Sequence, residues 1–280
     1  MKITILIDNS PSDNKELKHE HGFSAFIQTG KTNVLCDMGA SDSFIENSEL
    51  LGINLNTIDF AFISHGHSDH TGGLQTFIEK YQDKDIFIPQ NILNDRYYSH
   101  RHASKRDIST RLTDEARNSK RLKVVDKSEW ITSDIAIIKN IYTQNSKPHG
   151  NIFLYKSDHA SETEDDFSHE QSLAIKTDKG LVVVSPCSHC GAVNIMKSCC
   201  HFSGINKVAL FIGGMHIVEG DNTERESIDI ISEIKREYPD TIVFTGHCTC
   251  DHAKDILRSK SSNISIFRTG TSFSEDMFAN

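Results

Sequence analysis

The stretch FISHGHSDHTGGL, residues 62–74, decides how this chain is understood. Within six residues it places four side chains that can bind a metal ion: His65, His67, Asp69 and His70. These four residues follow an apolar run at 58–63. The glycines of the stretch permit the sharp turn that four ligands so close together require. Imidazole and carboxylate donors suit zinc, iron or manganese, whereas calcium and magnesium prefer shells of oxygen. The sequence therefore predicts a transition-metal site at the end of a hydrophobic strand.

The composition limits the class of protein. The 280 residues are enough for one large domain, and 37% hydrophobic with 25% charged residues is ordinary for a soluble globular chain. No run approaches the roughly 18 apolar residues that span a bilayer, and the first ten residues lack a signal-peptide cleavage site, so we expect no membrane partner. The net charge of −9 disfavours a nucleic-acid partner. Seven cysteines without an export signal favour a reducing cytoplasm.

Hydrophobic periodicity predicts alternating clusters of strands and helices. Short β-branched runs indicate strands at 3–7, 23–28, 33–36, 60–63, 85–88, 135–138, 152–155, 172–176, 181–185, 207–212 and 241–244. Helical spacing occurs at 41–51, 73–81, 192–202, 223–237 and 251–259. Ser41 is a plausible N-cap, and Thr223 with Glu226 has the spacing of a capping box. This order suits two sheets packed face to face with helices outside, and no linker divides the chain, so we expect one domain over residues 1–280.

Several motifs resemble one family. HGHSDH, residues 65–70, resembles the H-x-H-x-D-H signature of the metallo-β-lactamase fold hydrolases, and residues 20–39 resemble the hairpin and D-x-G turn before it. SPCSHCGAVNI, GGMH and TGHCTC resemble blocks of its 7,8-dihydropterin-6-yl-methyl-4-(β-D-ribofuranosyl)aminobenzene 5′-phosphate synthase-like subfamily. The resemblance runs over nearly the whole chain. It implies an α+β fold, the αββα four-layer sandwich of two mixed sheets, with a metal site at one edge.

The resemblance also implies a set of metal ligands. His65 and His67 would bind one metal, and Asp69 with His70 would bind the second. His247 lies in TGHCT, after the strand expected at 241–244, where the family has its final histidine. We expect two divalent transition-metal ions, with zinc as the first choice and iron or manganese as alternatives.

The middle ligands stay open at this point. Many relatives place a bridging aspartate after the strand expected at 181–185, but this chain has Pro-Cys-Ser-His there. We choose His189, because neutral imidazole is the commonest ligand type. Cys187 aligns more directly with the missing aspartate, and its thiolate could bind zinc. Upstream, His169 and Glu170 are both candidates, and the subfamily favours the acid. A separate cysteine-bound metal is not expected, because the cysteine pairs lie too far apart in sequence.

Three residues receive further roles. Asp69 would orient the nucleophile or accept its proton, with the metals lowering the pKa of a shared water. Asp37, in the Asp-Met-Gly turn, would hydrogen-bond a ligand imidazole and fix its tautomer. His216, after the strand expected at 207–212, would contact the substrate or transfer a proton. We therefore predict Asp69 and His216 as catalytic residues.

Two charge-biased stretches stand apart, one basic (96–123) and one acidic (158–170). Each is either a solvated surface or part of the site. In the second interpretation, a basic, partly helical insertion at about 90–125 would cover the active site. Its candidate cations for an anionic substrate are Arg101, Lys105 and Arg106.

These observations lead to a metal-dependent hydrolase acting on a small, anionic ester, phosphoester or lactone. The first alternative is a pterin-related transferase that joins an arylamine ribosyl phosphate to an activated pterin. The second is a non-catalytic metal-binding sensor on the same fold. Fold alone does not choose among them.

Overall fold

The computed structural model describes residues 1–157 and 161–278. The chain forms two compact units, and each unit is assembled from separate stretches of sequence. The first unit contains Met1–Val125, Phe153–Asp165 and Arg268–Met277. The second contains Asp126–Ile152 and Asp166–Phe267. Two compact units whose sequences interleave are compatible with one domain or with two, so the expectation of a single domain over residues 1–280 stays a prediction.

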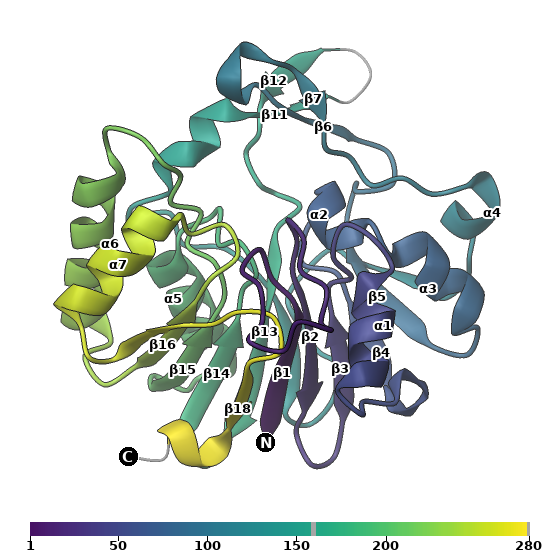
Figure 1. Ribbon diagram of the computed structural model, residues 1–280, viewed down its shortest axis with the longest axis horizontal. Coiled ribbons are helices and arrows are strands. Elements are labelled where there is room, and N and C mark those ends of the chain that lie inside the picture. The colour runs from purple at the N-terminus through teal and green to yellow at the C-terminus, as the bar shows by residue number, and fades with distance from the viewer. Residues whose placement is uncertain (158–160, 279–280) are drawn as a thin grey trace. The chain divides into compact units, whose positions relative to one another are not determined.

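The first unit is built on a seven-stranded sheet, part of which Figure 1 labels. Its strands, in spatial order, are β18 (Ser272–Ser274), β1 (Lys2–Ile7), β2 (Ser24–Gln28), β3 (Asn33–Cys36), β4 (Phe60–Phe62), β5 (Asp85–Pro89) and β8 (Leu122–Val125). Pairing is antiparallel from β18 to β3 and parallel from β3 to β8. The carboxyl ends of parallel strands reach one edge, so the segments after β3 and β4 leave the sheet side by side.

Helices cover this sheet through their apolar faces. The helices of the first unit are α1 (Ser43–Leu50), α2 (Ser68–Thr71), α3 (Leu74–Lys80) and α4 (Asp114–Arg117). Phe44 of α1 and Phe77 of α3 are fully buried in one cluster with Leu6, Phe26 and Leu35 of the strands. Burial of such side chains stabilises each by about 1.5–3 kcal/mol and fixes α1 and α3 against the sheet.

The basic and acidic stretches meet each other in a second, four-stranded sheet of the first unit. Its order is β12 (Glu162–Glu164), β11 (Leu154–Ser157), β6 (Arg96–Ser99) and β7 (Arg106–Asp107). Glu162 forms an ion pair with Lys105, and its Oε1 lies 2.7 Å from His100 Nε2. The expected insertion at about 90–125 contains the short strands β6, β7 and β8, the four-residue α4 and a 3₁₀ turn, joined by loops. The ammonium group of Lys105 is paired with Glu162 in this structure.

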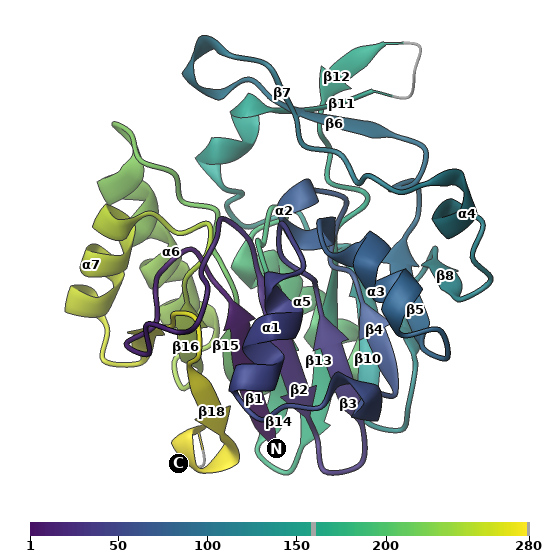
Figure 2. The same ribbon diagram turned by 45° about the vertical axis from the view of Figure 1, so that its right-hand side comes forward.

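The second unit has its own seven-stranded sheet. Its order is β17 (Ile264–Ile266), β16 (Ile242–Thr245), β15 (Val208–Ile212), β14 (Gly180–Val184), β13 (Gln171–Thr177), β10 (Ile135–Lys139) and β9 (Glu129–Trp130). Strands β14 to β17 are parallel, and their crossovers are α5 (Ala192–Ser203), α6 (Thr223–Glu237) and α7 (Asp251–Lys260). Helices α6 and α7 pack side by side (Figure 2). None of the described helices is long and apolar enough to cross a membrane.

Two helix starts differ from their predictions. Helix α1 begins after Asp42, not after Ser41, and α6 begins after Asn222, so that Thr223 is its first residue. The Thr223 hydroxyl bonds back to the loop at Gly220 instead of capping the helix. The capping-box prediction is therefore wrong, and Glu226 makes its hydrogen bond elsewhere.

Candidate metal centre

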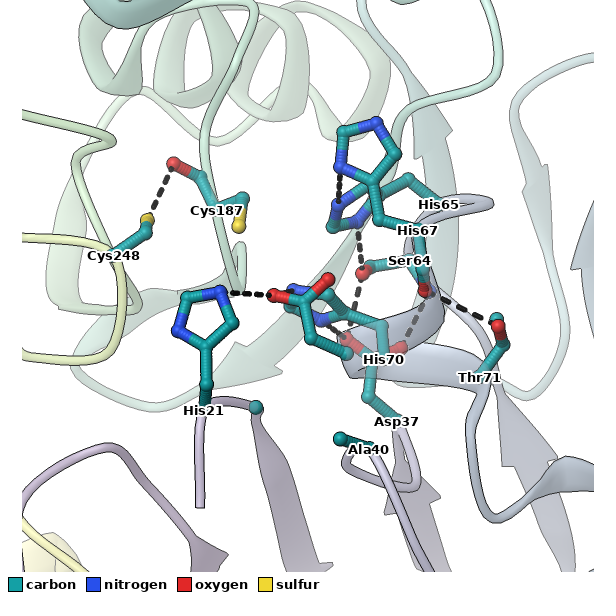
Figure 3. Close-up of polar contacts among 12 residues, drawn as sticks. His21, Asp37, Ala40, Ser64, His65, His67, His70, Thr71, Cys187 and Cys248 are labelled. Carbon is teal, nitrogen blue, oxygen red and sulfur yellow. Dashed lines mark hydrogen bonds and ion pairs between the residues drawn. The ribbon is translucent and has the colours of Figure 1, made fainter. Parts of the chain in front are cut away.

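The HGHSDH stretch forms a compact cluster of buried imidazoles in the first unit. It follows β4 and enters α2, for which His67 is the N-cap residue. His65 and His70 are fully buried and His67 is 4% exposed. The ring centroid of His65 lies 4.5 Å from that of His67 and 4.1 Å from that of His70. The structure thus brings together the three histidines that the sequence placed in one site (Figure 3).

Asp37 holds this cluster from the neighbouring turn after β3. Its Oδ1 accepts a hydrogen bond from Ser64 N at 2.7 Å, and its Oδ2 lies 2.6 Å from both Ser64 Oγ and His70 Nδ1. Ser64 Oγ in turn lies 2.9 Å from His65 Nδ1. The predicted hydrogen bond between Asp37 and an imidazole of the signature is therefore present, at His70. These contacts occupy the Nδ1 atoms of His65 and His70 and direct their Nε2 atoms toward the other donors.

The spacing of the donors fits a transition metal. His65 Nε2 lies 3.1 Å from His67 Nδ1, and His70 Nε2 lies 3.5 Å from Asp69 Oδ2. Two ligands about 2.0–2.2 Å from a tetrahedral zinc ion lie about 3.3–3.5 Å apart. The His70–Asp69 separation lies in this range, and the His65–His67 separation is about 0.2 Å shorter. The donor set is the imidazole and carboxylate set that zinc accepts.

Three neighbours of the cluster were not predicted from the sequence. His21 Nε2 lies 3.4 Å from Asp69 Oδ2, and buried Asp165 Oδ2 lies 3.9 Å from His67 Nε2. Ser64 links Asp37 to His65. Only Ser64 carried a sequence signal, because it stands directly before the signature; the other two reach the cluster through tertiary structure.

The second unit contributes a loop after β14 that Glu170 shapes. The backbone N–H groups of His189 and Cys190 donate to Glu170 Oε1 and Oε2, each at 2.7 Å. Desolvation by burial raises the pKa of the Glu170 carboxyl, opposed by these hydrogen bonds. Since both of its oxygens bind the backbone, Glu170 acts as a positioning residue, which weakens its candidacy as a metal ligand.

The ring of His189 is fixed on two sides. It stacks on Phe167 with ring centroids 4.4 Å apart and 6° between the planes, and its Nδ1 lies 3.1 Å from Asn151 Oδ1. The His216 ring centroid lies 4.2 Å away. The two predicted residues His189 and His216 therefore lie together, while His247 is buried directly after β16, where the sequence placed it.

Two cysteines join His216 in a further donor group. One donor atom each from Cys187, His216 and Cys248 lies within 4.8 Å of the others. The His216 N–H donates to Cys248 Sγ at 3.2 Å, and Cys248 Sγ lies 3.5 Å from the Cys187 carbonyl oxygen (Figure 3). Thiolate and imidazole are both zinc ligands. Cys187 thus stays a candidate, and Cys248, which the sequence analysis set aside, becomes one.

Left-handed backbone conformations gather at these loops. Asp37, Ser188, His216 and His247 all have positive φ, between 47° and 60°. Such conformations are uncommon for residues with a Cβ and cost on the order of 1–3 kcal/mol each. Three of the four, Asp37, His216 and His247, were singled out from the sequence, which agrees with a functional site.

Comparison with known proteins places the chain in a family. Residues 18–133 match the Metallo-beta-lactamase superfamily. Over 279 aligned residues the chain is 32% identical to "7,8-dihydropterin-6-methyl-4-(beta-D-ribofuranosyl)-aminobenzene-5'-phosphate synthase" of Methanocaldococcus jannaschii, covering 92% of this chain and 90% of that protein. The chain belongs to the metallo-β-lactamase superfamily.

Solved structures of the superfamily confirm the fold. The metal-dependent hydrolase Tm1679 of the beta-lactamase superfamily is similar over 98% of both chains, with a TM-score of 0.82 and 27% identity. Zinc-bound PqqB from Methylobacterium extorquens matches with a TM-score of 0.58 over 98% of this chain and 100% of its own, at 10% identity. The predicted metallo-β-lactamase α/β sandwich is therefore confirmed, and it supports a metal-dependent enzyme of this superfamily.

Proposed function

We propose that this chain is a metal-dependent transferase that joins an arylamine to an activated pterin. The proposal is carried by the 32% identity, over 92% of the chain, to a relative named as a synthase of a dihydropterin–aminobenzene phosphate. In the proposed reaction the arylamine nitrogen attacks the pterin methylene carbon. A C–N bond forms, the C–O bond breaks, pyrophosphate leaves and the amine loses a proton.

We assign the steps of this reaction to particular residues of the chain. The proposed metal ligands are His65, His67, Asp69, His70, His189 and His247, with Cys187 and Cys248 as alternatives. Bound divalent cations, zinc foremost, would supply positive charge for the departing pyrophosphate. His216 would accept the amine proton, since an imidazole titrates near neutral pH. Asp69, only partly buried, would orient the amine. Seven free thiols fit a reducing cytoplasm as the place of action.

One assay separates transfer from hydrolysis. Zinc-loaded protein is incubated with 6-hydroxymethyl-dihydropterin diphosphate, and pyrophosphate release is followed with and without an arylamine. We expect release only when the amine is present, with the coupled product forming in equal amount. His67→Ala should lose the activity, whereas His252→Ala, an exposed histidine on α7, should keep it. Release without the amine would contradict the transferase.

The second candidate is a hydrolase of a small, anionic ester, phosphoester or lactone. It is favoured by the likeness to the metal-dependent hydrolase Tm1679 over 98% of both chains. Water would then replace the arylamine as the nucleophile. Metal-dependent turnover of a phosphodiester, phosphomonoester or lactone would support this function. Full metal loading without turnover in either assay would favour a metal-binding sensor.

A further inference from the structure

The second unit contains a pocket that the proposed chemistry does not yet use. Its volume is about 290 Å³, and it lies beside the first turns of α6. Apolar side chains of Met215, Ile217 and Ile230 form part of its lining. Small-molecule pockets are commonly about 300–1,000 Å³, so this one holds a single ring system rather than two joined substrates.

The pocket adjoins His216. Met215 and Ile217, which both line it, flank His216 in sequence. The loop that carries the other wall also reaches this residue, because a Cβ added to Gly150 would lie 3.1 Å from His216 Cδ2. A ring held in the pocket would therefore lie beside a residue proposed to move a proton.

Glu226 places a carboxylate in this lining. Its Oε1 accepts a hydrogen bond from His149 N at 2.7 Å, and its Oε2 has no hydrogen-bond partner among the described residues. The nearby guanidinium of Arg225 is paired with Asp229 at 3.7 Å instead. Burial raises the pKa of the Glu226 carboxyl, opposed by the hydrogen bond and the charge of His149 and assisted by the nearby Asp229. A half-buried acceptor of this kind suits a ligand that brings N–H donors.

Cations lie at the rim of the same pocket. Lys147, Arg225 and Asp229 line it and are all exposed, and Asp229 is the partner of Arg225. The pocket therefore has a carboxylate acceptor against an apolar surface, and its exposed rim carries two cations and one acid. Its complement is a flat, apolar ring with an N–H edge and an anionic tail.

We propose that this pocket binds the 2-amino-4-oxopyrimidine ring of the substrate, with Glu226 accepting hydrogen bonds from the 2-amino group and the adjacent ring N–H. Lys147 and Arg225 face the phosphate tail. The inference rests on the proposed function in one respect: a pterin carries this ring. Guanine carries it too, so the test includes both.

Binding is measured directly, without turnover, by fluorescence titration of the purified protein with 6-hydroxymethylpterin. Glu226→Gln should weaken binding about tenfold or more, the loss expected for a hydrogen bond to a charged acceptor. Glu224→Gln, an exposed acid on the same helix, is the matched control and should bind as the parent does. Lumazine, which has an oxo group in place of the 2-amino group, should bind the parent weakly and lose this disadvantage in Glu226→Gln.

A second variant tests the proposed recognition of the phosphate tail separately from recognition of the ring. Arg225→Ala removes an exposed side chain, so it should leave binding of the unphosphorylated pterin unchanged and weaken only the diphosphate. Guanosine binding with the same dependence on Glu226 would support the ring class and assign it to a nucleotide. Equal pterin affinity in the parent and Glu226→Gln, or no preference over lumazine, would overturn the proposal. Pyrophosphate release without an amine, together with Glu226-dependent ring binding, would refute the transferase and leave the pocket assignment standing.

Discussion

Replacing Asp37 by Asn should separate the positioning of His70 from the metal ligands themselves. The aspartate accepts three hydrogen bonds, two from Ser64 and one from His70 Nδ1, at 2.6–2.7 Å. Asn keeps the shape and also tolerates the left-handed backbone at φ 55°, but it has only one accepting oxygen. At least one buried donor then faces an NH₂ group, which costs about 1.5–3 kcal/mol for a bond to a charged partner.

The expected loss of zinc affinity is about 10–100-fold, because the His70 ring is no longer held by its second nitrogen. Competition with a chromophoric chelator measures this affinity, and chemical unfolding of the metal-free protein measures stability. Asp59→Asn is the control, since Asp59 Oδ2 accepts one exposed backbone N–H, from Asn33 at 2.7 Å, and contacts no ligand histidine. If Asp37→Asn bound zinc as tightly as the Asp59→Asn control, the orienting role would be refuted.

Three other substitutions or treatments test separate parts of the structure. His67→Ala should lower the metal content by at least one ion per chain in elemental analysis; unchanged content would contradict the ligand assignment. Gly72→Ala would place a Cβ 2.1 Å from a backbone carbonyl and should cost more than about 3 kcal/mol in chemical unfolding, whereas Gly220→Ala, with nothing within 4 Å, should stay within about 0.5 kcal/mol. Cys36 and Cys199 should resist iodoacetamide at pH 8 in the native protein and react after unfolding, because burial raises the pKa of both thiols; rapid native labelling, read by mass spectrometry, would refute this.

The longer elements of the fold could be predicted from the sequence because each carries its own apolar pattern. The strand at 33–36 and the helix at 223–237 have the predicted bounds. The strands that were missed are short, and their residues do not reveal pairing: β7 is two exposed residues, and β18 exists because β1 offers it an edge. Such strands are defined by their partners rather than by local preference.

Some residues of the candidate site could likewise be predicted from local sequence, and others could not. His65 and His70 could be predicted because their spacing is local, and Asp37 because it stands in a recognisable turn. Glu170 was one of two open candidates for a metal ligand, and its two hydrogen bonds to the loop at 189–190 could not be predicted because they depend on how β13 and β14 pair. Asp165 reaches His67 from a distant part of the chain and gave no local signal.

The edge strand β18 has a consequence for biosynthesis. Residues 272–274 pair with β1, and the Met1 ammonium group lies 2.8 Å from Glu275 Oε2, so β1 pairs on this side with a strand about 270 residues later in the chain. Until residues 272–274 have been synthesised, one side of the β1 backbone lacks its partner strand, a condition that favours association between nascent chains. A variant lacking residues 272–280 should therefore accumulate in inclusion bodies even though every proposed metal ligand is present.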